Sequence, residues 1–184
     1  MKPGVRAVGI AESFTGETST LAAVVTRASR VVDGFAFGTC TVGGTDATEE
    51  IVHLFHDLDR EDVAYLLIAG VAPAWYNILD LERLQQAVDR PVMAVTFEES
   101  AGLEPALERE FSGADLEDRL DRYRRLPERH PLEVDGHDLY VRSVGIERED
   151  SHAVIQAFTP EGGRPEPLRL ARLAARAADR WQHV

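Results

Sequence analysis

Histidine, cysteine and glycine-rich segments are present in this sequence, but none of them forms a complete metal-binding, disulfide or phosphate-binding motif. His53 and His56 are three residues apart in a stretch of helical spacing, but a metal site there needs further ligands, so we interpret both as exposed or core-edge histidines. Gly43-Gly44 matches neither the GxxxxGK pattern nor the GxGxxG spacing of phosphate-binding loops. Cys40 is the only cysteine, which excludes an internal disulfide, and its strand-like surroundings indicate a small core residue.

The stretch from Tyr65 to Asn77 is a better guide to where a ligand binds. It opens as an unbroken apolar run, which is typical of a strand covered on both faces of a parallel sheet. Gly70 and Pro73 end that strand, and residues 77–88 then have helical spacing. Ligands of open α/β sheets bind at the carboxyl ends of such strands, so we expect the site here. The residue at this strand end is Ala69, whose methyl group can carry out no chemistry.

The elements around this strand predict a mixed sheet flanked by helices. Short connections favour antiparallel hairpins between the first three strands, at residues 5–10, 20–26 and 31–41. A helix follows Asp46, and residues 64–97 have the pattern of a βαβ unit with parallel strands. The remaining expected elements are charged helices within 98–130, a loop at 131–136, a strand at 137–144, and helices at 147–158 and 168–181. No linker divides the chain, so we expect residues 1–184 to form one domain.

The charge balance is strongly acidic. The sequence has 20 lysine and arginine residues against 32 acidic ones, a net charge of −12, and Lys2 is the only lysine. Such a surface is what a salt-rich, halophilic cytosol favours, and it argues mildly against nucleic acid as a partner at low salt. No apolar run is long enough to span a bilayer, and the first residues have no signal-peptide pattern, so we expect a soluble cytoplasmic protein with no membrane partner.

Together with this order of elements, several segments resemble a known family. They are residues 2–10, 33–34, 41–48, 77–84, 91–92 and 163–169. Over essentially its whole length the sequence resembles the archaeal, largely uncharacterised endonuclease dU family, which is itself similar to endonuclease V. The resemblance implies an α/β, ribonuclease H-like fold, in which three antiparallel strands precede a parallel βαβ unit and helices flank the mixed sheet.

The resemblance also implies a metal-dependent endonuclease that acts on deaminated DNA. Such chemistry needs carboxylates at adjacent strand ends, where they hold Mg²⁺ or Mn²⁺. In the family pattern the first strand ends in aspartate and the central strand ends in Asp-Gly, whereas this sequence has Ala11 and Ala69 at those positions. Because the two strands are neighbours in this fold, the two missing carboxylates would face each other.

Three other carboxylates are the remaining candidates for metal ligands, and Asp46 and Glu12 for catalytic residues. Asp46 matches the position of a helix-starting acidic ligand in endonuclease V, and it can also be a helix N-cap. Glu12 points to the opposite face from Ala11 unless the strand ends early. Glu166 begins the last helix, where the helix dipole alone favours a carboxylate, and the same reasoning applies to Asp80.

Two hypotheses follow for the function. One is a metal-dependent endonuclease of deaminated DNA, with Asp46, Glu12 and Glu166 holding metal. The other is a non-catalytic binding module on the same fold, which the loss of two carboxylates favours. In either case Arg164, Arg169 and Arg172 can contact phosphate or form a solvated face. The candidate substrate-binding residues are Arg164, Asn77 and Tyr76. The aromatic pair Trp75 and Tyr76 can either stack on a base or pack against the neighbouring helix.

Overall fold

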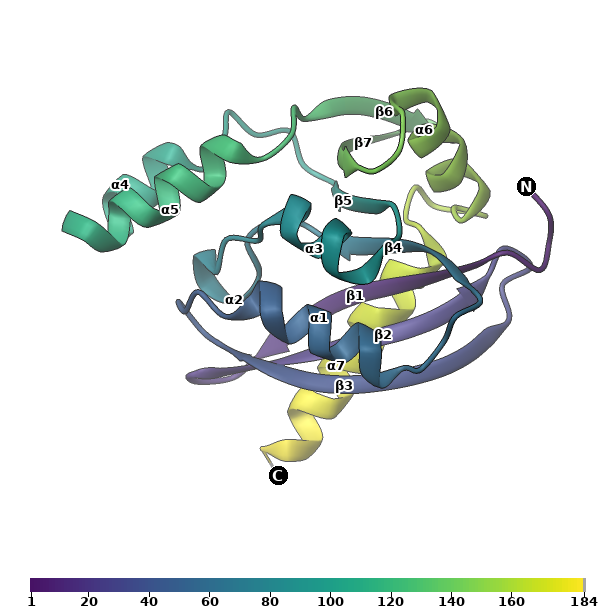
Figure 1. The fold of residues 1–184 in the computed structure, drawn as a ribbon, viewed down its shortest axis with the longest axis horizontal. Helices are drawn as coiled ribbons and strands as arrows, with labels where there is room; N and C mark the ends of the chain where they lie inside the picture. Colours follow the sequence, from purple (N-terminus) through teal and green to yellow (C-terminus); the bar gives the residue numbers. More distant parts are fainter. Residues whose placement is uncertain (184) are drawn as a thin grey trace.

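A seven-stranded mixed sheet forms the centre of the protein, and the computed structural model describes residues 1–183 (Figure 1). The strand order is β3-β2-β1-β4-β5-β7-β6, with β1 and β4 parallel, β4 and β5 parallel, and every other neighbouring pair antiparallel. The strands are β1 (Arg6–Phe14), β2 (Thr18–Arg27), β3 (Val32–Thr41), β4 (Val63–Ala69), β5 (Val92–Thr96), β6 (His130–Val134) and β7 (His137–Val144). This confirms the predicted mixed sheet with an antiparallel meander followed by a parallel βαβ unit.

Helices cover both faces of the sheet. They are α1 (Ala47–Asp57), α2 (Pro73–Tyr76), α3 (Leu81–Val88), α4 (Glu104–Glu110), α5 (Gly113–Arg125), α6 (Arg148–Ala157) and α7 (Glu166–Gln182). The helices α1 and α3 pack on one face, whereas α6 and α7 pack on the other, and α7 runs across β1 and β2 (Figure 1). No helix among residues 1–183 has the length and apolar character needed to cross a bilayer.

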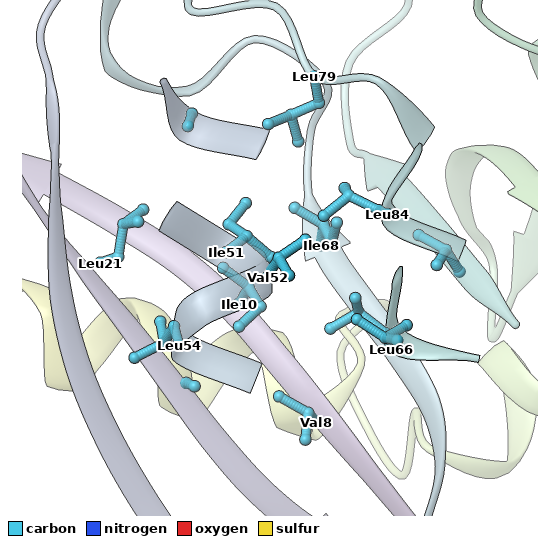
Figure 2. Packing of buried hydrophobic residues seen from close by; sticks show 14 of the residues in the cluster. Val8, Ile10, Leu21, Ile51, Val52, Leu54, Leu66, Ile68, Leu79 and Leu84 are labelled. Atoms are coloured by element: carbon cyan, nitrogen blue, oxygen red, sulfur yellow. The ribbon is translucent and has the colours of Figure 1, made fainter. Parts of the chain in front are cut away.

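The larger part of the core lies between α1 and the sheet. Figure 2 shows Ile51 and Leu54 of α1 lying against Ile10 of β1 and Ile68 of β4, and these side chains are at most 2% exposed. The three- and four-residue spacing of the apolar stripe puts these α1 side chains on one face of the helix, so their burial fixes its position over the ends of β1 and β4. Cys40 is buried in the same cluster, as its sequence context predicts.

Three predicted segments differ from the structure. The first strand, expected at residues 5–10, is β1 and continues to Phe14. The loop expected at residues 131–136 is instead strand β6, joined to β7 by Asp135 and Gly136, which both have positive φ angles, 50° and 76°. An Asp-Gly pair is the signature of a two-residue hairpin turn of this kind. The helix expected over residues 77–88 begins only at Leu81, because the Asp80 carboxylate accepts a hydrogen bond from the Arg83 N–H and caps it.

The chain between β4 and α3 has an unusual backbone. Ala74, Trp75 and Tyr76, in the segment labelled α2, all have left-handed φ angles, of 49°, 59° and 60°. For residues with a Cβ atom this conformation costs roughly 1–2 kcal/mol each. Contacts elsewhere must therefore stabilise this turn, and one of them is the hydrogen bond from the Gly43 N–H to the Ala74 carbonyl.

Candidate functional site

Alanines occupy the two positions of β1 and β4 where the resemblance implies carboxylates in the family; Ala69 ends β4, whereas Ala11 lies within β1. Ile10 of β1 pairs with Ile68 of β4, so Ala11 and Ala69 lie next to each other one residue further on. Both belong to an apolar cluster with Val24 of β2 and Ala171 of α7, and Ala11 and Ala171 are buried. Helix α7 thus packs methyl groups onto this edge of the sheet. The position holds no side-chain oxygen atom that could bind a divalent cation.

Asp46 takes part in a hydrogen-bond network at the start of α1. It occupies the N-cap position, as predicted, but its carboxylate makes no capping bond. Instead Oδ2 accepts a bond from the Thr41 hydroxyl at 2.7 Å, and Oδ1 accepts one from Asn77 Nδ2 at 2.7 Å. Burial raises the pKa of Asp46, but these hydrogen bonds outweigh it and the net pKa lies below the usual value. The carboxylate is therefore ionised and already has donors for its oxygens.

Asn77 lies beneath Asp46 and has no exposed surface. Its Oδ1 atom accepts the N–H of Ala47, the first residue of α1, at 3.1 Å, while Nδ2 also donates to the Thr41 carbonyl at 3.0 Å. Asn77 thus caps α1 from a distant part of the chain. Because both ends of the amide are engaged with the protein, Asn77 does not face the cleft described below.

The other two candidate ligands are held by partners of their own. Strand β1 continues to Phe14, so Glu12 points away from the face of Ala11, and its carboxylate accepts a bond from the Ser19 hydroxyl at 2.7 Å. Glu166 begins α7 and forms a two-bond ion pair with Arg169, both bonds 2.7 Å long, which lowers the pKa of Glu166. Asp80, the fourth acidic candidate, caps α3 as described above.

These donors do not fit the Mg²⁺ or Mn²⁺ ions that the resemblance implies. Within residues 1–183, no group of three or more histidine, cysteine, aspartate or glutamate side chains could hold a metal ion. Hard divalent cations need several converging oxygen ligands, and the structure does not bring Asp46, Glu12 and Glu166 together.

The aromatic residues after β4 pack against a neighbouring loop and also reach the surface. Tyr76 makes edge contacts with Trp75 and with Phe111, at ring-centroid distances of 5.3 and 6.0 Å. Phe111 in turn lies 4.0 Å below the guanidinium group of Arg119, which donates to the carbonyls of Gly43 and Gly44. Trp75 is 49% exposed. Tyr76 therefore links the turn to the α4–α5 region, and Trp75 keeps a free face.

A cleft of about 1050 Å³ lies at the carboxyl ends of β4 and β5, where the sequence predicts a ligand site. Ala69 and Gly70 form part of its floor. It reaches from the start of α7 on one face of the sheet to β7 and the loop before β6. Its polar lining is dominated by arginine, with Arg129, Arg142, Arg164, Arg169, Arg172 and Arg176, beside the carboxylates of Glu98 and Glu99.

Among residues 1–183, most of these arginines have no acidic partner within ion-pair distance. Of the cleft arginines, Arg169 alone forms an ion pair within residues 1–183, and its partner is Glu166. Arg164 lies over the ring of Phe97, with its guanidinium carbon 4.3 Å from the ring centre. Of the predicted phosphate contacts, Arg164, Arg169 and Arg172 all line the cleft. The cleft thus concentrates positive charge on a protein whose net charge is −12.

Sequence reasoning missed the far wall of the cleft. The β6–β7 hairpin brings Arg129 to Tyr140 and Arg142 of β7, and the pairing of β7 with β5 places all three beside the cleft. The Asp135-Gly136 pair is the local signal that could have indicated this wall, because a two-residue hairpin turn there sets the register that brings Arg129 to Arg142 and Tyr140.

Comparison with known proteins gives one family for nearly the whole chain. The family model described as Endonuclease dU matches residues 3–179. A "UPF0215 protein" of Pyrobaculum calidifontis is 37% identical over 172 residues, which cover 91% of this chain and 93% of that protein.

Solved structures share the fold at lower identity. A protein of unknown function from Archaeoglobus fulgidus superimposes with a TM-score of 0.83 at 23% identity, over 95% of this chain and 98% of that one. Endonuclease V of Ciona intestinalis, solved in complex with a DNA containing inosine, superimposes with a TM-score of 0.62 at 11% identity, over 95% of this chain and 85% of that one. The fold is therefore ribonuclease H-like and similar to endonuclease V. The chain belongs to the endonuclease dU family.

Proposed function

We propose that this protein binds nucleic acid through its arginine-lined cleft and has weak or no metal-dependent cleavage activity. The observation that carries the proposal is the presence of that cleft together with alanines at positions 11 and 69, where the resemblance implies carboxylates. Arginine groups without acidic partners suit phosphate oxygens, which they bind with paired N–H donors. Ala11 and Ala69 supply no ligand for the metal ions that hydrolysis of this class requires.

DNA containing a deaminated base is the first substrate class to test. The support is the endonuclease dU family and the shared fold with an endonuclease V whose structure contains inosine DNA. The acidic net charge opposes long-range attraction, so binding should depend on the local charge of the cleft.

The family alone favours the competing hypothesis, a metal-dependent endonuclease built on Asp46, Glu12 and Glu166. That hypothesis requires the three carboxylates to leave the hydrogen bonds and ion pair that hold them, and to converge. Asp46 would have to lose its hydrogen bonds with Asn77 and Thr41, and Glu166 would have to lose its ion pair with Arg169.

The test is equilibrium binding of fluorescent DNA that contains uracil or hypoxanthine. The variant Arg172→Gln with Arg176→Gln removes two charges from the cleft, and we expect about a tenfold or greater loss of affinity, since charged hydrogen bonds to phosphate contribute roughly 1.5–3 kcal/mol each. Arg180→Gln is the matched control, because Arg180 is an exposed residue of the same helix that does not line the cleft. Equal affinities of the cleft variant and the control would contradict the proposal.

A further inference from the structure

Two arginines at the far wall of the cleft form a compact pair that the predicted phosphate contacts do not include. Arg142 lies in β7, opposite Ala94 of β5, and Arg129 immediately precedes β6. Since β7 lies between β5 and β6, the sheet brings both to the same end of the cleft.

Neutral groups hold Arg129 in place. Its guanidinium carbon lies 3.9 Å from the centre of the Tyr140 ring. It donates to the Thr96 hydroxyl at 3.2 Å, to the Ser100 carbonyl at 3.1 Å and to the Glu98 carbonyl. Each guanidinium has five N–H donors, so donors of Arg129 remain for a ligand.

Neutral groups also hold Arg142, which is half-buried. It donates to the Pro127 carbonyl and, at 3.5 Å, to the Tyr123 hydroxyl. Its guanidinium carbon is 5.5 Å from the centre of the Tyr123 ring. Burial lowers the pKa of Arg142, and the positive charge of Arg129 lowers it further. The β6–β7 register supports this closeness, because Arg129 lies opposite Arg142 one step beyond the His130–Val141 pair.

The absence of a nearby acid is the informative feature. Across residues 1–183, no carboxylate lies within ion-pair distance of Arg129 or Arg142, although Glu98 and Glu99 line the same cleft. The partly buried arginines at the opposite end of the sheet are different, since Arg6 and Arg60 both pair with Asp33 and Asp62. Partly buried charges of one sign without a counter-charge are costly, so an anionic ligand would stabilise them.

We infer that Arg129 and Arg142 form a binding site for a phosphomonoester, the terminal phosphate of a nucleic-acid strand lying in the cleft. Two fixed guanidinium groups match the nearly doubly charged terminal phosphate better than the singly charged diester of a strand interior. Tyr123 and Tyr140 beside them offer a surface for the terminal sugar or base. This inference rests on the proposed function, and it adds that the protein binds strand ends.

The test compares short single strands of one sequence that carry either a phosphate or a hydroxyl at the 5′ end, and likewise at the 3′ end. We expect one of the phosphorylated ends to bind about tenfold or more tightly than its hydroxyl counterpart. The preference should shrink below about pH 6, where the second proton returns to the phosphate. This comparison uses the unaltered protein, so it does not depend on how a variant folds.

Variants then assign the site. Arg129→Gln and Arg142→Gln should each reduce the phosphate preference towards none, whereas Arg172→Gln should weaken both strands equally and keep their ratio. The conservative changes Arg129→Lys and Arg142→Lys retain the charge and should keep part of the preference, which separates lost charge from lost folding. A preference that persists in both glutamine variants would overturn the assignment.

The remaining outcomes separate the two proposals. Equal binding of phosphorylated and hydroxyl ends by the unaltered protein would overturn the terminal-phosphate site and leave nucleic-acid binding intact. Binding of neither strand would overturn the proposed function and this assignment with it. Competition by a nucleoside monophosphate or inorganic phosphate as strong as that by the phosphorylated strand would mean that the site binds a free phosphomonoester, which overturns its assignment to strand ends.

Discussion

Asn77 and Asp46 are joined by a hydrogen bond of 2.7 Å from Nδ2 to Oδ1, and the same amide accepts the N–H of Ala47 at the start of α1. Asp46, for which the sequence resemblance predicts a metal-ligand role, is therefore part of the structural link between β3, α1 and the turn after β4. The Asp46 carboxylate thus has a structural role in this fold, which differs from the catalytic role that the family resemblance suggests.

We predict that Asn77→Ala destabilises the protein by roughly 1–3 kcal/mol, because it leaves the buried Ala47 N–H without its acceptor and removes one donor from the Asp46 carboxylate, which keeps the Thr41 donors. Chemical denaturation measures the change. Gln86→Ala is the control, since Gln86 lies on the exposed side of α3 and its loss should change stability little. An Asn77→Ala variant as stable as the unaltered protein would show that this network does not hold α1.

Introducing the missing carboxylates should be costly. Ala11→Asp together with Ala69→Asp places two acidic side chains next to each other and against Ala171. Without metal, we expect the free energy of unfolding to fall by about 3 kcal/mol or more. Added Mg²⁺ or Mn²⁺ should raise the unfolding midpoint of this double variant and leave that of the unaltered protein unchanged. A metal-dependent rise in the unaltered protein would contradict our interpretation of the strand ends. Ala177→Asp, on the exposed side of α7, controls for added charge.

The ion pairs at the opposite end of the sheet predict a pH dependence. Hydrogen bonds from Arg27 and Arg6 lower the pKa of Asp33 from 3.8 to about 2. Because the folded-state pKa is the lower one, the ionised Asp33 stabilises the fold above pH 3.8, and this contribution is lost as the pH falls towards about 2. The free energy of unfolding of Asp33→Asn, measured by denaturation, should decline less steeply between these pH values than that of the unaltered protein. Identical pH profiles would exclude this role for Asp33.

The left-handed turn predicts a gain from glycine. Ala74 has a φ of 49°, a conformation that glycine adopts at no steric cost, so Ala74→Gly should raise the free energy of unfolding by about 1 kcal/mol. Ala175→Gly is the matched control, since this alanine lies within α7 and the same change there should lower stability by about 1 kcal/mol. A loss of stability in both variants would argue against the left-handed conformation.

The sequence predicts the sheet better than its edges. The unbroken apolar run that begins at Tyr65 and the short connections before Thr41 identify strands because burial and hairpin geometry act locally. Strand β6 was missed because its five residues include Pro131, which has no N–H and so weakens a strand pattern. The late start of α3 depends on Asp80 as its cap and on the left-handed turn before it, and neither follows from apolar spacing.

The site was predictable only in part. The carboxyl end of β4 could be located, and Ala69 there and Ala11 on the neighbouring strand could be read directly from the sequence. The hydrogen bonds of Asp46, Glu12 and Glu166 could not be predicted, because each depends on the three-dimensional arrangement of the chain or on the rotamer of a side chain. Arg129 and Arg142 were missed because residues 131–136 were expected to form a loop, whereas the β6–β7 hairpin puts Arg129 opposite Arg142, one step beyond the His130–Val141 pair.

The most direct test of the account combines binding and cleavage in one sample. The protein is mixed with hypoxanthine- or uracil-containing DNA and Mg²⁺ or Mn²⁺, at a protein concentration that saturates the DNA. The strands are separated after incubation. We predict that the DNA is bound and recovered intact. Metal-dependent cleavage that disappears in Asp46→Ala would contradict the account and show that the surviving carboxylates form a working metal site.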